Sequence, residues 1–575
     1  MFDNSFWSAL TNEAHSRYSV AMFHSKVVSI LVLSAIGMPF LRGQEQPVKL
    51  AAQARFDLTS SSAKLEKAEV LAGNGQIQRM SWIKGEAQEK AYTANFAITR
   101  FGWNEIAVRF LPVGNGPVEL KLMGPWEQAS AGKVYRQEVL WDSIEVSGAS
   151  LKSGDFEAEK GSLPPGWVSG GGVLEAGTAF GGKNSARTWH NQTLSTTLEV
   201  KAGEPVTVKL YARAYVPPGY PEMKSFAGKQ TAAHKAAKGF MRGANFGNYL
   251  EVPPSQNWGL PHNDDDLKHM EQEGFDHVRL PIGWHHYAGP GPEFKLTDAI
   301  FAQVDNLVTN ALKHHLNVMV NIHHFDAFTS NPEEQKGKFI ALWRQIAEHY
   351  AQSSAGVAFE LLNEPKDKAT TTLLNPIYTE VIREIRKTNP TRVIFVGPGK
   401  WNSIDELSSL MLPDDDENLI VTVHCYEPFY FTHQGATWAG GDTKVKGIQF
   451  PGPPSTPLTP DPTLKLPKHV EDWIRRYNTL PTEKNPSGPA AFRAKIRLAR
   501  EWSEYYGRPV HMGEFGCFVM ADPQSRANFY SSFREVLEEN KIGWAVWDWK
   551  AGFKYWDPEK GEPAPGMRKA LFGKQ

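Results

Sequence analysis

The chain has 575 residues, with 62 Lys and Arg against 63 Asp and Glu. This balance argues against a basic surface for nucleic acid or for an anionic membrane. The two cysteines, Cys425 and Cys517, are too few for a disulfide framework or a cysteine-based zinc site. We expect both to be buried free thiols.

Residues 1–46 are predicted to be a targeting segment. The apolar run 27–41 follows a His and a Lys; it is short for a membrane span but suits the core of a signal peptide. Met22 stands where such a peptide would begin, so residues 1–21 are interpreted as an over-extended start. A retained membrane anchor is the alternative, because no small-x-small cleavage site is evident. A secreted, periplasmic or extracellular location is expected.

Residues 47–215 are predicted to form an all-β, jelly-roll-like sandwich. Segments such as 118–122 alternate apolar and polar side chains between Gly and Pro clusters, which is typical of short strands. The region is either one module or two that meet near Gly154. The phrases around 139–144 and Gly154 loosely resemble carbohydrate-binding sandwiches. Residues 216–238 open with prolines and are predicted to be a linker.

From residue 239 to the end at 575, short apolar strands alternate with amphipathic helices. The helices are predicted at 298–315, 333–351, 372–388 and 488–506, with Asp298 and Asn331 as N-caps. The strands are predicted to end near Asn245, Arg279, Ile322, Leu362, Val396, His424, Met512 and Trp547. Such an alternation predicts an α/β fold, a (β/α)8 TIM barrel.

An open nucleotide-binding sheet is the alternative fold. It usually carries a Gly-rich phosphate loop after its first strand, whereas residues 242–247 contain no G-x-G-x-x-G. One barrel unit is oversized, because residues 425–487 separate a strand from the next long helix and are rich in Pro, Gly, Trp and Tyr. Long loops in compact domains are usually functional. We expect this insertion to form a wall of the active-site cleft.

Polar and ionisable residues follow the apolar strands, where the catalytic groups of such barrels gather. These residues are Arg279, His323-His324, Asn363-Glu364-Pro365, His424-Cys425-Tyr426, Gly513-Glu514 and Trp547-Asp548. Retaining glycoside hydrolysis needs two carboxylates ~5–5.5 Å apart, one protonated and one ionised. Since a barrel unit averages ~31 residues, three units plus the insertion place Glu364 and Glu514 on strands 4 and 7.

The stretch 239–550 resembles glycoside hydrolase family 5, the cellulase-type branch of the clan with glutamates on strands 4 and 7. Asn363-Glu364-Pro365 resembles the acid/base signature of that family, and Gly513-Glu514-Phe515-Gly516 resembles its nucleophile signature. Arg279, His323, the His424-x-Tyr426 pair and Trp547 follow in the order of the family. The resemblance implies a (β/α)8 barrel that hydrolyses β-glycans with retention.

The resemblance also implies roles for the strand-end residues. Arg279 is expected to pair with the nucleophile Glu514 and keep it ionised, and Tyr426 to donate to it. Asn363 is expected to bond the sugar 2-hydroxyl. His424 is expected beside the acid/base Glu364.

His323 is expected to contact the same sugar, and it is favoured over His324 because adjacent strand residues point oppositely. Trp547 would form an aromatic floor. Trp401, Trp284 and Trp438 are candidates for neighbouring subsites, with packing as the alternative. No metal or other cofactor is expected, because the His pair lacks a spaced carboxylate or Cys set.

The expected function is that of an endo-β-1,4-glucanase, acting as a monomer on a polysaccharide or oligosaccharide. A β-mannanase, a xyloglucanase and a β-1,3-glucanase of the same family are alternatives. A glycan-binding protein that no longer turns over substrate is an alternative of another class, and the presence of both glutamates argues against it.

Overall fold

The computed structural model describes residues 49–83, 86–99, 102–127, 134–159, 161–218 and 225–573. The predicted targeting segment therefore lies outside the described residues. Within these ranges, no helix has the length and apolar character that crossing a bilayer requires.

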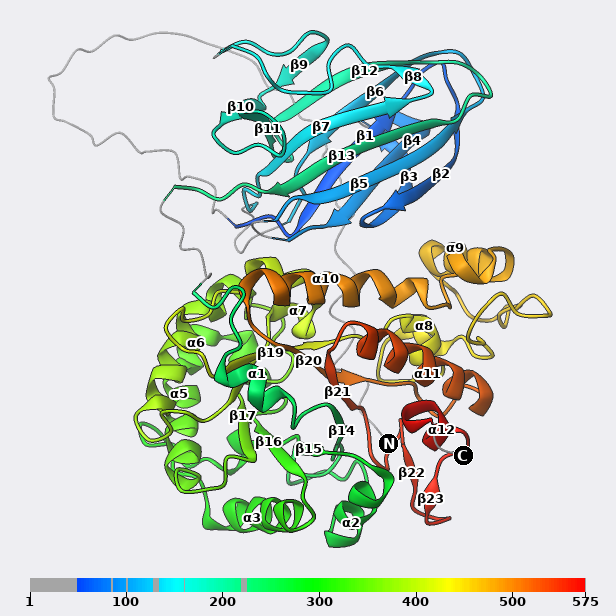
Figure 1. Ribbon diagram of the computed structural model, residues 1–575. Coiled ribbons are helices and arrows are strands. Elements are labelled where there is room, and N and C mark those ends of the chain that lie inside the picture. The colour runs from blue at the N-terminus through cyan, green and yellow to red at the C-terminus, as the bar shows by residue number, and fades with distance from the viewer. Residues whose placement is uncertain are drawn as a thin grey trace, which may run out of the picture.

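The N-terminal region consists of two antiparallel sheets around one core (Figure 1). The first sheet has the order β3 (Asn74–Ile83), β4 (Glu86–Ala97), β1 (Gln53–Thr59), β6 (Gly116–Met123), β12 (Thr193–Val200) and β8 (Ala149–Ser150), with β9 (Trp167–Gly170) also paired to β12. The second has the order β10 (Val173–Ala176), β11 (Asn184–Thr188), β7 (Val139–Ser147), β13 (Val206–Ala214), β5 (Asn104–Pro112) and β2 (Leu65–Ala72).

Strand β13 shows that the two sheets form one module. Its side chains alternate between buried and half-buried, so Val208 and Leu210 face the core. It pairs with β5 on one side and with β7 on the other, and it thus joins the halves of the region that precede and follow Gly154. A division into two modules near Gly154 would cut this pairing.

Residues 225–238 differ from the predicted linker, because they pack against the barrel. Thr231 caps a short helix, α1 (Ala232–Ala237), whose Ala233 shares a buried cluster with Phe240 and with barrel-floor residues such as Phe395. Alanine is the strongest helix former and also the smallest helical side chain. The Ala-rich sequence therefore forms a helix that can approach the floor of the barrel closely.

The C-terminal region is a closed parallel barrel of eight strands, which confirms the predicted fold class. The strands are β14 (Arg242–Asn245), β15 (His277–Leu280), β16 (Asn317–Asn321), β17 (Val357–Glu360), β18 (Ile394–Val396), β19 (Leu419–His424), β20 (Val510–Phe515) and β21 (Gly543–Val546). The main helices around it are α2 (Asp264–Glu273), α3 (Asp298–Lys313), α5 (Pro332–His349), α6 (Thr371–Arg386), α10 (Ala490–Tyr506) and α11 (Pro523–Glu539).

The four predicted helices correspond to α3, α5, α6 and α10, with ends displaced by at most two residues. Asn331 is the N-cap of α5 as predicted, although its side chain makes no capping hydrogen bond. The prediction of Asp298 as an N-cap was wrong by one position. Thr297 occupies that position, and Asp298 is the first residue of α3, where its charge suits the helix dipole.

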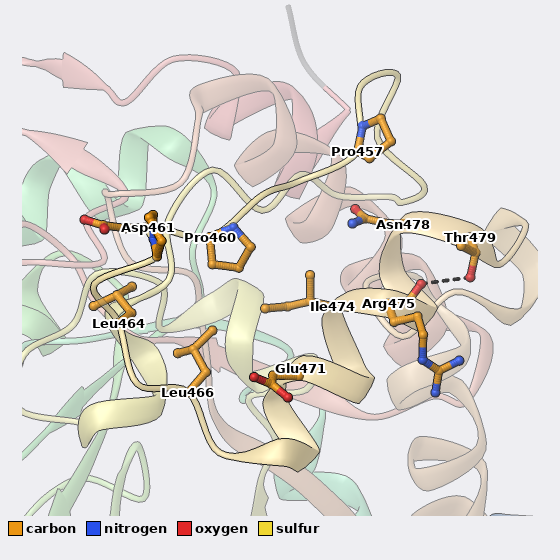
Figure 2. A pocket seen from close by; sticks show the side chains of 11 residues that line it. Pro457, Pro460, Asp461, Leu464, Leu466, Glu471, Ile474, Arg475, Asn478 and Thr479 are labelled. Carbon is orange, nitrogen blue, oxygen red and sulfur yellow. Dashed lines mark hydrogen bonds between the residues drawn. The ribbon is translucent and has the colours of Figure 1, made fainter.

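The insertion 425–487 is more ordered than a simple loop, since it contains α8 (Phe429–Thr432) and α9 (Lys468–Thr479). Its first part lies beside the loop after β20, where the Phe518 amide donates to the Thr432 carbonyl. Its later part lies at the periphery of the barrel, where α9 and a proline-rich loop enclose a pocket of ≈ 640 Å³ (Figures 1 and 2). The residues lining this pocket do not include any of the predicted strand-end residues. Only the first part is thus placed to border the cleft.

The sandwich lies against the flank of the barrel beside α10 (Figure 1). Strand β3 contacts α10, and Lys484 of the insertion pairs with Glu69 of β2. At another point Lys49, which precedes β1, pairs with the buried Glu406 of the barrel region. The two regions therefore meet through packing and through buried charge.

Candidate active site

The side chain of Arg279, at the end of β15, is fully buried at the mouth of the barrel. It donates two hydrogen bonds to the carboxylate of Glu360, of 2.6 and 2.7 Å. It also donates to Asn245, Asn363 and Glu514, each at 2.7 Å. One planar guanidinium thus fixes four side chains from the ends of three other strands, a geometry for which its fork of five donors is suited.

Glu514, in β20, is held at both carboxylate oxygens. Arg279 donates to Oε1 at 2.7 Å, and the hydroxyl of Tyr426 donates to Oε2 at 2.8 Å. Burial nevertheless raises the pKa of Glu514 above its ordinary value, although His424, Arg279 and Tyr426 oppose the rise. The expected lowering by Arg279 is therefore present, but desolvation outweighs it.

Glu364 follows β17 with a left-handed backbone (φ 43°), which turns its side chain toward Glu514 across the mouth. Its Oε1 lies 2.9 Å from Nδ1 of His424. Burial raises the pKa of Glu364 to about 7, against the lowering effects of Arg279 and Lys366. A glutamate with such a pKa is largely protonated in mildly acidic solution and can serve as a general acid.

Asn402 sets the proton position on His424. The amide oxygen of Asn402 accepts from the backbone N–H of Glu364 at 3.1 Å, so its NH2 group points to Nε2 of His424 at 3.4 Å. Burial lowers the pKa of His424 to about 4, which keeps the ring neutral. The single ring proton then lies on Nδ1 and is donated to Glu364.

One carboxylate oxygen of Glu364, one of Glu514 and a ring nitrogen of His424 lie within 4.8 Å of one another. Among the described residues this is the one group with the spacing of metal ligands. The donor set fits a metal poorly, because Arg279 and Tyr426 already donate to the two oxygens of Glu514. A cation would also have to displace the proton of Glu364. The arrangement suits proton transfer and nucleophilic attack at one centre.

Two features beside the glutamates suit a sugar ring. The amide oxygen of Asn363 accepts from Arg279, while its Nδ2 is buried without a partner among the described residues. Trp547 is half-buried, and its ring lies parallel to that of His323, with centroids 5.7 Å apart. A Cβ atom at Gly247 would come within 2.7 Å of the Trp547 ring, so a glycine is needed there. A buried donor without a partner and a half-buried aromatic ring thus lie beside the glutamates.

The remaining aromatic candidates differ in exposure. Trp401 and Trp438 are 55% and 50% exposed. Trp284 is fully buried and donates to the carbonyl of Asn321, so its proposed subsite role was wrong and it packs in the core. Trp258, which was not singled out from the sequence, is 44% exposed near the ring of His324.

Sequence reasoning missed Glu360 and Asn402, and it named Asn245 only as a strand end. All three are buried and hydrogen-bonded to the site residues that it identified. The signal for Glu360 was a lone charge at the end of the apolar strand Val357–Glu360. Cys425 and Cys517 are buried free thiols, as predicted.

The model of the family Cellulase (glycosyl hydrolase family 5) matches residues 239–552. Endoglucanase 3 of Fibrobacter succinogenes is 28% identical over 355 residues, which cover 59% of this chain and 53% of that protein. Endoglucanase C of Acetivibrio thermocellus is 28% identical over 325 residues, which cover 54% of this chain and 91% of that protein. The chain thus spans about half the length of the first relative and most of the second.

Solved structures resemble the barrel region. Endoglucanase Cel5A from the hyperthermophilic Thermotoga maritima has 32% identity and a TM-score of 0.51, covering 59% of this chain and 99% of that one. Subunit Z of the cellulose synthase of Clostridioides difficile has 30% identity and a TM-score of 0.50, covering 58% and 99%. The family match spans more than half of the chain and contains both glutamates, so this chain belongs to glycosyl hydrolase family 5.

Proposed function

We propose that this chain is a retaining endo-β-1,4-glucanase, with Glu364 as the acid/base and Glu514 as the nucleophile. The observation that carries the proposal is that one carboxylate oxygen of Glu364 lies within 4.8 Å of one of Glu514, beside a neutral His424. Retaining enzymes hold their carboxyl groups ~5–5.5 Å apart, whereas inverting enzymes leave ~6.5–9.5 Å for a water molecule. The close approach of the two oxygens favours the shorter, retaining separation.

In the first step, an oxygen of Glu514 attacks the anomeric carbon while the glycosidic C–O bond breaks. Glu364 transfers its proton to the departing oxygen, for which a pKa of about 7 is suited. In the second step, the Glu364 carboxylate takes a proton from water, the water oxygen attacks the anomeric carbon, and the ester bond to Glu514 breaks. Two inversions give net retention.

Neighbouring groups support both steps. The donors Arg279 and Tyr426 fix the attacking carboxylate. The free Nδ2 of Asn363 is placed to donate to the sugar 2-hydroxyl, a contact that strengthens in an oxocarbenium-like transition state. Trp547 supplies an apolar face for the same ring.

The substrate class rests on the relatives, which are endoglucanases. Mannan is the second candidate, because Cel5A of Thermotoga maritima has been solved both with cellobiose and with mannotriose. Carboxymethylcellulose, mannan, xyloglucan and laminarin should be compared by release of reducing ends. A fall in viscosity early in carboxymethylcellulose hydrolysis is expected for internal cleavage, and faster hydrolysis of mannan would favour the second candidate.

We also propose that the protein acts as a monomer outside the cytoplasm. The sequence of the N-terminus supports this location, through the apolar run 27–41, and so does the polymeric nature of the substrate. N-terminal sequencing of protein recovered from the culture medium or periplasm of its host would test the location, and analytical ultracentrifugation would test the monomeric state.

Azide tests the roles of the two glutamates. On an aryl cellobioside with a very good leaving group, Glu364→Ala should still form the glycosyl-enzyme and then stall, because its base is missing. Azide needs no base and should restore turnover with a β-glycosyl azide as product. Glu514→Ala with azide should instead give the α-azide by one displacement. Proton NMR distinguishes the two azides by their anomeric configuration. An α-azide from Glu364→Ala and a β-azide from Glu514→Ala would mean that the two roles are the reverse of those proposed.

A further inference from the structure

The sandwich and the barrel are joined by a cluster of two lysines and two glutamates near the mouth. Lys49 lies 3.0 Å from Glu127 of the sandwich and 3.4 Å from Glu406 of the barrel region. Lys400 lies 2.9 Å from Glu406 and 3.7 Å from Glu127. The side chains of Lys49 and Glu406 are only 2% and 3% exposed. Opposite charges that alternate in this way around the buried pair of Lys49 and Glu406 tolerate little displacement.

The barrel side of this cluster is continuous with the acid/base. Lys400 belongs to α7 (Gly399–Asn402), a turn in which Trp401 donates from its backbone to the carbonyl of Pro365 at 3.1 Å. Asn402, the last residue of the turn, accepts from the backbone of Glu364. Because Glu364 protonates the departing oxygen, this turn borders the leaving-group side of the cleft.

The same turn has an unfavourable backbone. Lys400, Trp401 and Asn402 all adopt left-handed conformations, with φ of 50°, 58° and 53°. Consecutive residues with side chains rarely adopt this region, and such strain persists only where the surroundings over-determine it. Trp401, in the middle of this turn, is 55% exposed.

The sandwich presents a second exposed indole on its own side of the cluster. Trp126 precedes Glu127 directly, and it is 51% exposed. One edge packs against the ring of His190, with centroids 4.8 Å apart, so the side chain is supported rather than free. Trp126 is thus the sequence neighbour of Glu127, and Trp401 is the neighbour of Lys400. The charged groups of Glu127 and Lys400 lie 3.7 Å apart.

We propose that Trp126 is a sugar-binding platform that continues the leaving-group side of the cleft from Trp401 onto the sandwich. The ligand is the reducing-end part of a β-1,4-linked glucan chain, which lays the C–H faces of its rings on the indoles. The sandwich is then a part of the substrate cleft, held in place by the charge cluster, rather than an independently tethered binding module. This inference rests on the proposed function.

The experiment compares short and long substrates in Trp126→Ala. An aryl cellobioside places only its aryl group on the leaving-group side, so its kcat/KM should change less than twofold. For cellohexaose, kcat/KM should fall by about tenfold, because a lost stacking contact removes apolar area from burial. Cellohexaose labelled at its reducing end should also be cut at bonds nearer that end. Trp126→Phe keeps a flat ring and should restore most of the wild-type cleavage pattern.

Phe180→Ala is the matched control, because Phe180 is an exposed aromatic side chain (47%) that stacks on Tyr211 of the other sheet. It should leave both substrates unaffected. An unchanged cleavage pattern in Trp126→Ala would overturn the inference, and so would equal losses on the two substrates, which indicate a structural role. A wild-type protein without activity on either substrate would instead overturn the proposed function.

Discussion

Replacing Glu364 by glutamine tests whether the active site destabilises the fold. Burial raises the pKa of Glu364 from 4.5 to about 7, so the folded barrel disfavours its ionised form. Below pH 4.5 the group is protonated in both states and has no effect. As the pH rises toward 7 the unfolded chain gains ionisation that the folded chain lacks, and stability falls. A difference of 2.5 pKa units corresponds to about 3 kcal/mol, a cost that Glu364→Gln does not carry.

Calorimetry at pH 4.5 and at pH 8 measures this difference. One kcal/mol shifts the midpoint of a domain of this size by about 2 °C, so the gap between Glu364→Gln and wild type should widen by about 6 °C from the lower to the higher pH. Glu559→Gln, which changes an exposed glutamate, should track the wild type. A gap that stays constant between the two pH values would refute the reasoning.

The same substitution has a kinetic signature. In the wild type, kcat/KM should fall as the pH rises above about 7, because the acid loses its proton. It should also fall at low pH, where Glu514 takes up a proton with a pKa above its ordinary value. For Glu364→Gln on a dinitrophenyl cellobioside, only the acidic limb should remain. A persistent alkaline limb would place the acid elsewhere.

Two further substitutions test the surroundings of the glutamates. Arg279→Met leaves the buried charge of Glu360 unpaired and should lower the free energy of unfolding by about 3–5 kcal/mol, measured by chemical denaturation; wild-type stability would contradict the role of this pair. Gly247→Ala forces a Cβ to within 2.7 Å of the Trp547 ring and should lower kcat/KM about tenfold, since small misplacements of a sugar platform are costly. Gly337→Ala, in open space on α5, is its control and should keep full activity.

The catalytic residues could be predicted because their signals are local in the sequence. A carboxylate that follows an apolar strand, as Glu364 follows Val357–Glu360, needs a reason to be there, and barrels gather their chemistry at such points. The barrel could be predicted because short apolar strands alternate with helices whose apolar residues recur with the helical period. The order of the strand-end residues then placed Glu514 three units after Glu364.

Contacts between distant segments could not be predicted in this way. In the sequence, Glu360 is a single charged residue at the end of an apolar strand. Only the fold shows that it pairs with Arg279, 81 residues earlier in the chain. The contact between Lys49 and Glu406 spans 357 residues. The segment before the barrel illustrates the same limit, because its prolines suggested a spacer while its alanines formed a helix against the floor. Periodicity describes how each segment folds, but not which surface it meets.

Two glutamates, the buried Glu406 and the half-buried Glu364, show how the molecule separates stability from chemistry. Glu406 is surrounded by Lys49, Lys400 and the hydroxyl of Thr371, and although burial opposes them, these groups hold its pKa below the ordinary value. Glu364 accepts one hydrogen bond from a neutral His424, and its pKa rises to about 7. The charge at the domain junction is thus compensated and fixes the sandwich, whereas the charge at the mouth is left undercompensated, so that Glu364 still holds a proton to donate near neutral pH. The turn α7 connects the two, because its Lys400 pairs with Glu406 and its Asn402 accepts from the backbone of Glu364.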